Sequence, residues 1–94
     1  MAAKKKVVDC PPGTEFIFKL PNGTVVGQAK NIVEFEEMLW QVPLPSLVYH
    51  TEGKHFGGWL RFIGEDKVAE RIDQISSDDI AIRMKLIDAV KKRK

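Results

Sequence analysis

The feature that most constrains the fold is a pair of short alternating stretches joined by Asn22-Gly23. Phe16, Phe18 and Leu20 occupy every second position of the first stretch, which places them on one face of an extended strand. Asn-Gly tolerates the positive φ angles of a tight type I′ turn, so the chain is expected to reverse there. The two predicted strands are residues 15–20 and 24–29.

Downstream of this hairpin, apolar residues recur at helical spacing in four segments. Asn31 is placed to cap the first helix, with Glu34 in the capping-box position, and Pro43 is expected to end it. Residues 46–53 are ambiguous and predict no more than one helical turn. The predicted helices are 31–42, 56–63, 66–75 and 78–90. Because an isolated hairpin is marginal in water, the sequence predicts an α+β fold, an N-terminal two-stranded β-hairpin packed on about four helices.

Length and composition indicate one small domain: 94 residues, of which 44% are apolar, give room for a single core and exclude a wholly disordered chain. We expect a flexible leader over residues 1–13, a single domain over 14–90 and a basic tail over 91–94. The one cysteine, Cys10, allows no intrachain disulfide and favours a reducing, cytoplasmic compartment. No apolar run approaches a membrane span, so no membrane partner is expected. The density of Lys, Glu and Arg is typical of thermophile proteins.

Two predicted helices carry apolar residues outside a single stripe. On the first helix, Val33 and Trp40 fall beside the stripe rather than in it. On the last, Ile80, Met84 and Ile87 define one face, and a second set lies nearly opposite. Burying both faces is hard in so small a chain, so the second face is expected either to contact a partner or to be covered intramolecularly. The protein-interface candidates are therefore Trp40, Ile82, Leu86 and Ala89.

Positive charge is concentrated at the two ends of the chain. Residues 76–94 carry six basic and three acidic residues, whereas residues 10–75 carry six basic and nine acidic ones. An alternative reading is a nucleic-acid-associated protein whose C-terminal cations contact phosphates. The candidates are Lys85, Lys91, Lys92, Arg93 and Lys94. Against this reading, the acidic body lacks the basic stripe of a nucleic-acid binder.

His50 and His55 form a candidate functional loop. A second alternative is a small metal-dependent domain around them, but their spacing matches no zinc-binding pattern. The competing interpretation is that both rings hydrogen-bond to nearby groups and fix the loop. Cys10 is flanked by proline rather than placed at a helix N-terminus, so no feature activates it as a nucleophile. No catalytic residue, metal site or cofactor is predicted.

The run His50…His55-Phe56-Gly57-Gly58-Trp59-Leu60, followed by Ile63-Gly64-Glu65-Asp66-Lys67-Val68-Ala69-Glu70-Arg71-Ile72, resembles a motif in a family of small uncharacterised archaeal and bacterial domains. In that family a His precedes a Phe-x-x-Trp helix, a Gly-Asp step and a Leu-Ala pair. The resemblance covers about residues 14–76, with Val68 in place of the Leu and Glu65 inserted in the Gly-Asp step. The family has no assigned reaction, so the resemblance implies fold boundaries and no catalytic residue.

Together these features favour a non-enzymatic protein-interaction or assembly module. We expect a homo-oligomer or a protein partner, contacted through the last helix and Trp40. Nucleic-acid association and metal dependence remain the two alternatives.

Overall fold

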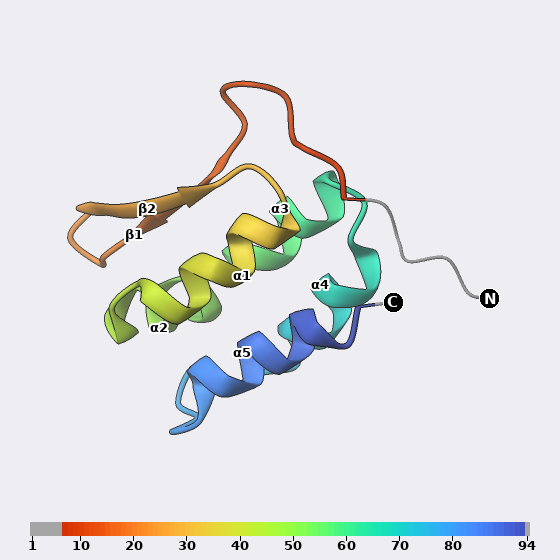
Figure 1. Cartoon of the computed structure of the whole chain (residues 1–94). Helices are drawn as coiled ribbons and strands as arrows, with labels where there is room; N and C mark the ends of the chain where they lie inside the picture. Colours follow the sequence, from red (N-terminus) through yellow and green to blue (C-terminus); the bar gives the residue numbers. More distant parts are fainter. Residues whose placement is uncertain (1–6, 94) are drawn as a thin grey trace.

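The computed structural model of the chain describes residues 7–93 as a two-stranded antiparallel hairpin followed by five helices (Figure 1). The predicted α+β class is confirmed. The elements are β1 (Phe16–Lys19), β2 (Val25–Ala29), α1 (Ile32–Gln41), α2 (Leu44–Glu52), α3 (His55–Phe62), α4 (Asp66–Asp73) and α5 (Ile82–Lys91). No helix within the described residues is long and apolar enough to cross a bilayer.

The hairpin forms where the alternation predicts it, but its turn differs from the predicted type I′. The Gly23 N–H donates to the Leu20 carbonyl at 2.8 Å, and the Leu20 N–H donates to the Thr24 carbonyl at 2.8 Å. Gly23 has a φ of 92°, whereas Asn22 is not among the positive-φ residues. This is a three-residue loop, Pro21 to Gly23, with one left-handed glycine, and Pro21 suits its first position because its ring fixes φ near −65°.

The helices also show one addition and one shift against the predicted boundaries. The Asn31 side chain caps α1 as predicted, accepting the Glu34 N–H at 2.9 Å. Residues 44–52 form a complete helix rather than a single turn. Pro43 and Pro45 start α2 as well as end α1, since proline is tolerated in the first turn of a helix. The last helix begins at Ile82 rather than at residue 78.

The elements pack as layers, with α1 and α2 in the middle. Figure 1 shows the hairpin on one side of α1 and α2, and α5 on the other, while α3 and α4 close one end. The most deeply buried large side chains come from every layer. They include Phe18, Phe35, Leu39, Leu47, Phe56, Leu60 and Leu86.

This layering corrects the prediction that α5 presents a second apolar face to a partner. Ile82, Leu86 and Ala89 are exposed by only 2%, 0% and 5%, and they belong to the chain's own core. Because Ile80 precedes the helix and both Ile80 and Met84 are exposed, the buried residues of α5 fall within one arc of roughly 160° rather than on two faces. That arc is covered by α1, α2 and α4, so these three residues are not available to a partner.

Part of the predicted leader packs against the domain. Residues 1–6 lie outside the described part of the chain. Cys10 is 7% exposed, and its backbone N–H donates to the Lys30 carbonyl at 2.7 Å. The Asn31 side chain donates to the Asp9 carboxylate at 2.8 Å. The second half of the leader is therefore attached to the folded unit at the end of the hairpin.

Candidate functional site

His50 projects from α2 into the space between the hairpin and α3. Its side chain is 3% exposed, although the ring can carry a charge. The rings of Phe16 and Phe56 lie beside it, with centroids 4.9 and 5.3 Å from the imidazole. The Lys19 N–H of β1 donates to its Nε2 at 2.9 Å, and its Nδ1 lies 3.0 Å from the Nδ1 of His55. We call this chain of contacts, from Lys19 through His50 to His55, the histidine bridge.

The hydrogen bonds of the histidine bridge fix its protonation pattern. A ring nitrogen that accepts a hydrogen bond carries no proton, so neutral His50 must carry its proton on Nδ1. His50 therefore donates and His55 accepts between the two Nδ1 atoms. Burial of the ring, with smaller contributions from the neighbouring His55 and Lys19, lowers the pKa of His50 from 6.5 to about 4. The buried ring is thus neutral near pH 7.

A compact loop places His55 opposite His50. Lys54 precedes α3 with a φ of 56° and is the non-glycine residue with positive φ among residues 7–93. Such a conformation is costly for a residue with a Cβ and persists where surrounding contacts hold it. At Gly53, an added Cβ would lie 2.3 Å from the His55 Nε2, so the ring packs directly over this glycine. The loop is therefore shaped to hold the exposed His55 ring in one position.

The histidine bridge is arranged as a structural link between elements. No group of three or more His, Cys, Asp or Glu side chains in the described part of the chain could hold a metal ion. A metal on His50 would have to displace Lys19 or His55 from a ring nitrogen. The buried hydroxyls of Ser46 and Thr51 have no hydrogen-bond partner, so neither donates to His50 as an activated nucleophile would. His50 thus accepts a backbone N–H, as the competing interpretation expects, whereas His55 contacts the His50 ring rather than the backbone or a carboxylate.

The candidate phosphate contacts lie against acidic groups of the same chain. Lys91 pairs with Glu36 at 3.3 Å, and Lys92 pairs with Asp88 at 3.2 Å. Lys85 pairs with Asp79, and its hydrogen bond lowers the pKa of that carboxyl. Lys94 lies outside the described residues. Exposed pairs of this kind are weak, but they reduce the positive charge offered to a phosphate backbone.

Arg93 is the clearest departure from the predicted basic tail. Its Nε and one terminal nitrogen both lie 2.8 Å from a Glu65 carboxylate oxygen. The Glu65 and Arg93 side chains are only 4% and 15% exposed. This buried pair joins the end of the chain to the start of α4. Sequence reasoning missed it because Glu65 resembles an ordinary residue of a helix start, and only burial reveals its role.

Of the interface candidates, Trp40 alone is exposed. It is 50% exposed at the end of α1, together with Val33 at 51% on the same side of that helix. Their predicted position outside the buried stripe of α1 is confirmed. Large aromatic side chains left at a surface are candidates for contact with another protein.

Comparisons with protein-family models, with curated proteins and with solved structures find no significant match for this chain. The resemblance drawn from the His50 to Ile72 segment therefore stays a prediction.

Proposed function

We propose that this chain is a non-enzymatic protein-interaction domain that associates with a second copy of itself. The contact surface is an apolar corner formed by Trp40, Ile80 and Met84. The observation that carries the proposal is that Arg83 donates to the carbonyls of Leu39 and Trp40, at 2.8 and 3.2 Å. These hydrogen bonds hold the end of α1 against the start of α5, so exposed apolar residues far apart in sequence gather in one region.

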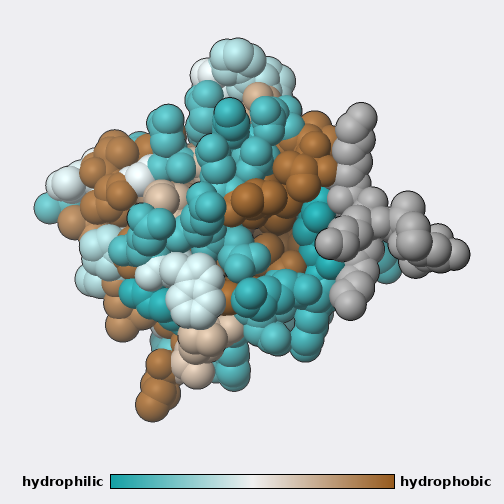
Figure 2. Space-filling view, viewed as in Figure 1, coloured by the Kyte–Doolittle hydropathy of each residue, from teal (hydrophilic) through white to brown (hydrophobic). Residues whose placement is uncertain are grey.

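The exposure of these side chains supports an interface. Trp40, Ile80 and Met84 are exposed by 50%, 98% and 53%. Figure 2 shows hydrophobic atoms projecting at the lower left, over the loop before α5. Full burial of a large aliphatic side chain contributes about 1.5–3 kcal/mol. An apolar group that the chain leaves entirely in water is therefore a substantial source of binding free energy.

The loop that carries Ile80 is already ordered. The Asp79 carboxylate accepts the Ala81 N–H at 2.8 Å and pairs with Lys85. Ile82, two residues after Ile80, is anchored in the core. Binding through a fixed loop loses less conformational entropy than binding through a disordered one. Ile80 is thus a preorganised apolar projection rather than part of a free segment.

Charge around the apolar corner favours a second copy as the partner. The α1 side carries Glu37 and the α5 side carries Arg83, whereas Glu36 and Lys91 already pair with each other within one chain. A two-fold axis places each patch against the same patch of the other subunit, so the acidic side of one copy meets the basic side of the other. Glu37 has no ion pair within residues 7–93, which leaves it available for such a contact.

The free, buried thiol of Cys10 suits the reducing, cytoplasmic compartment that we propose.

The test is sedimentation equilibrium over a range of protein concentrations. We expect the wild type to form a dimer, and we expect Trp40→Glu combined with Met84→Glu to stay monomeric. Ile80→Asp should weaken the dimer by itself, because a charge at a buried contact is costly to desolvate. Circular dichroism and thermal unfolding of each variant establish that it is folded.

Matched controls separate this surface from exposed apolar residues elsewhere. Val25→Asp on the hairpin and Phe62→Glu on α3 alter residues that are each 58% exposed, and both variants should remain dimeric. A wild type that stays monomeric up to about 1 mM, where an association of about 4 kcal/mol would be detected, refutes the proposal. Equal dissociation by the control variants would also refute it.

A further inference from the structure

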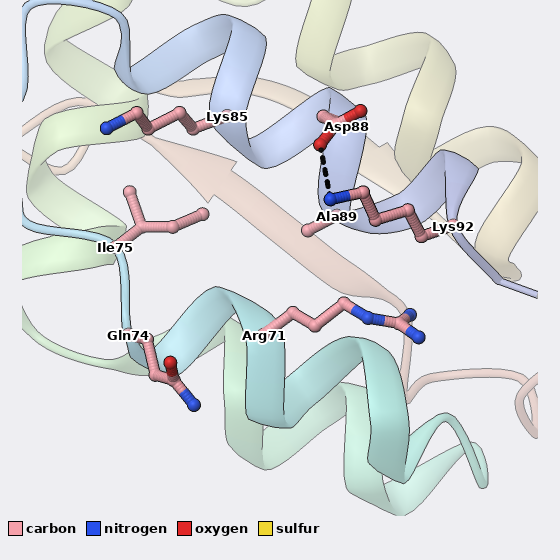
Figure 3. Close-up of a pocket in the computed structure, with 7 residues that line it drawn as sticks. All are labelled: Arg71, Gln74, Ile75, Lys85, Asp88, Ala89 and Lys92. Carbon is pink, nitrogen blue, oxygen red and sulfur yellow. Dashed lines mark ion pairs between the residues drawn. The ribbon is translucent and has the colours of Figure 1, made fainter.

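A groove runs between α4 and α5, and none of its residues belongs to the apolar corner. Its volume is about 320 Å³, at the lower end of the sizes typical of small-molecule sites. Figure 3 shows the side chains that line it. They are Arg71, Gln74, Ile75, Lys85, Asp88, Ala89 and Lys92.

The two ends of the groove differ in the charges that they present. Figure 3 shows Ala89 in its middle, with Arg71 and Lys92 extending toward one end and Lys85 lying above Ile75 at the other. Three cations and one carboxylate, Asp88, line the groove. Two of these cations have carboxylate partners, Lys92 with Asp88 and Lys85 with Asp79. The Lys92–Asp88 pair is largely exposed and the Lys85–Asp79 pair is partly exposed, so water and salt weaken both pairs and a competing anion can displace them.

Arg71 differs from these lysines because its charge has no partner. It forms no ion pair with any residue in the described part of the chain, and its Nη1 is buried without a hydrogen-bond acceptor. A buried, unpaired donor costs free energy that an added acceptor recovers. Arginine is also the side chain whose planar donors best match a carboxylate or a phosphate. A polar group of this kind at the edge of an open groove indicates an anionic ligand.

We propose that the α4–α5 groove binds a small amphiphilic anion, a compound with one carboxylate or phosphate head and a short hydrocarbon body. The head group lies between Arg71 and Lys92, where a rotation of the last torsions of Arg71 turns its unpaired Nη1 toward the ligand. The hydrocarbon body lies on Ile75 and Ala89. The ligand thus uses both parts of the groove, which a bare inorganic anion does not.

Calorimetry and amide NMR shifts on the full chain test this assignment with four probes. The probes are hexanoate, hexyl phosphate, inorganic phosphate and hexylammonium. Both amphiphilic anions should bind and shift the amides of α4 and α5, and the tighter of the two identifies the preferred head group. Inorganic phosphate should bind at least tenfold more weakly than hexyl phosphate, because it leaves the apolar floor uncovered. Hexylammonium should not bind.

Charge-matched variants then separate a built site from general attraction to positive charge. Arg71→Gln and, independently, Lys92→Gln should each weaken hexyl phosphate binding about tenfold or more. Lys67→Gln removes the same charge from the exposed side of α4 and should leave the affinity unchanged. Absence of binding by both amphiphilic anions, equal affinity in the wild type and both groove variants, or equal binding of hexylammonium would each overturn the proposal.

Discussion

The histidine bridge makes the stability of the protein depend on pH in a way that can be calculated. The pKa of His50 falls from 6.5 in the unfolded chain to about 4 in the folded one, chiefly because the ring is buried. Between these two values the unfolded state binds more protons than the folded state, so stability falls as the pH falls. The contribution is fully present above pH 6.5 and is lost progressively as the pH decreases toward 4. From this difference alone, acidification from pH 7.5 to pH 5.0 lowers the free energy of unfolding by about 2 kcal/mol.

The assay is urea unfolding of the wild type and His50→Gln at several pH values between 7.5 and 5.0. Glutamine places an acceptor near the position of the imidazole Nε2, so it keeps the hydrogen bond from Lys19 and removes the titration. The variant is expected to be less stable at pH 7.5 because it replaces a packed aromatic ring. Between pH 7.5 and 5.0, however, it should lose about 2 kcal/mol less than the wild type does. Carboxylate titration affects both proteins and cancels in this difference.

His55→Asn is the matched control, since it removes the other histidine while offering an acceptor to His50. Most of the wild-type pH dependence should remain, because burial of His50 is the largest cause of its lowered pKa. If wild type and His50→Gln lose equal stability between pH 7.5 and 5.0, the assignment of a neutral, buried His50 is wrong.

Two further predictions concern residues outside the histidine bridge. Arg93→Met should lower the free energy of unfolding by about 3–5 kcal/mol in urea unfolding, because it removes the ion pair with the buried Glu65 carboxylate. Glu65→Gln added to it should restore part of that loss, and a loss below about 1 kcal/mol would contradict the burial of this pair. In α3, Gly58→Ala should stabilise the helix by about 1 kcal/mol because an added Cβ meets no atom within 4 Å. Gly57→Ala should be less stable than Gly58→Ala, since its Cβ would lie 2.5 Å from an Asp73 carboxylate oxygen, and equal thermal stability of the two variants would refute this reasoning.

Local patterns predicted most of the elements because their causes are local. The hairpin follows from alternation around Asn22-Gly23, and the start of α1 follows from the side chain of Asn31. The errors arise where one residue type serves two purposes. Pro43 is predicted to end α1, but Pro43 and Pro45 also occupy positions where a new helix begins. Ser76 resembles a helix cap, yet its hydroxyl accepts the Asp78 N–H in a turn that precedes α5.

The candidate site was less predictable because its determinants are distant in sequence. The spacing of His50 and His55 indicates that their rings can meet, but nothing local indicates that Lys19 of the hairpin supplies the backbone N–H. Burial decides the roles of Glu65 and Arg93 in the same way. Their separation of 28 residues gives no pattern that sequence periodicity could detect.

The burial of α5 determines which apolar residues can bind a partner. A short chain can cover a wide apolar arc on one helix when its middle layer packs against other elements on both sides. The helices α1 and α2 form such a layer between the hairpin and α5 (Figure 1). Ile82 and Leu86 are thereby committed to the core, whereas Ile80, at 98% exposure, is not. Because the core already encloses its own residues, the exposed side chains at the apolar corner are not remnants of an incomplete fold. We propose that a second copy of the chain covers them.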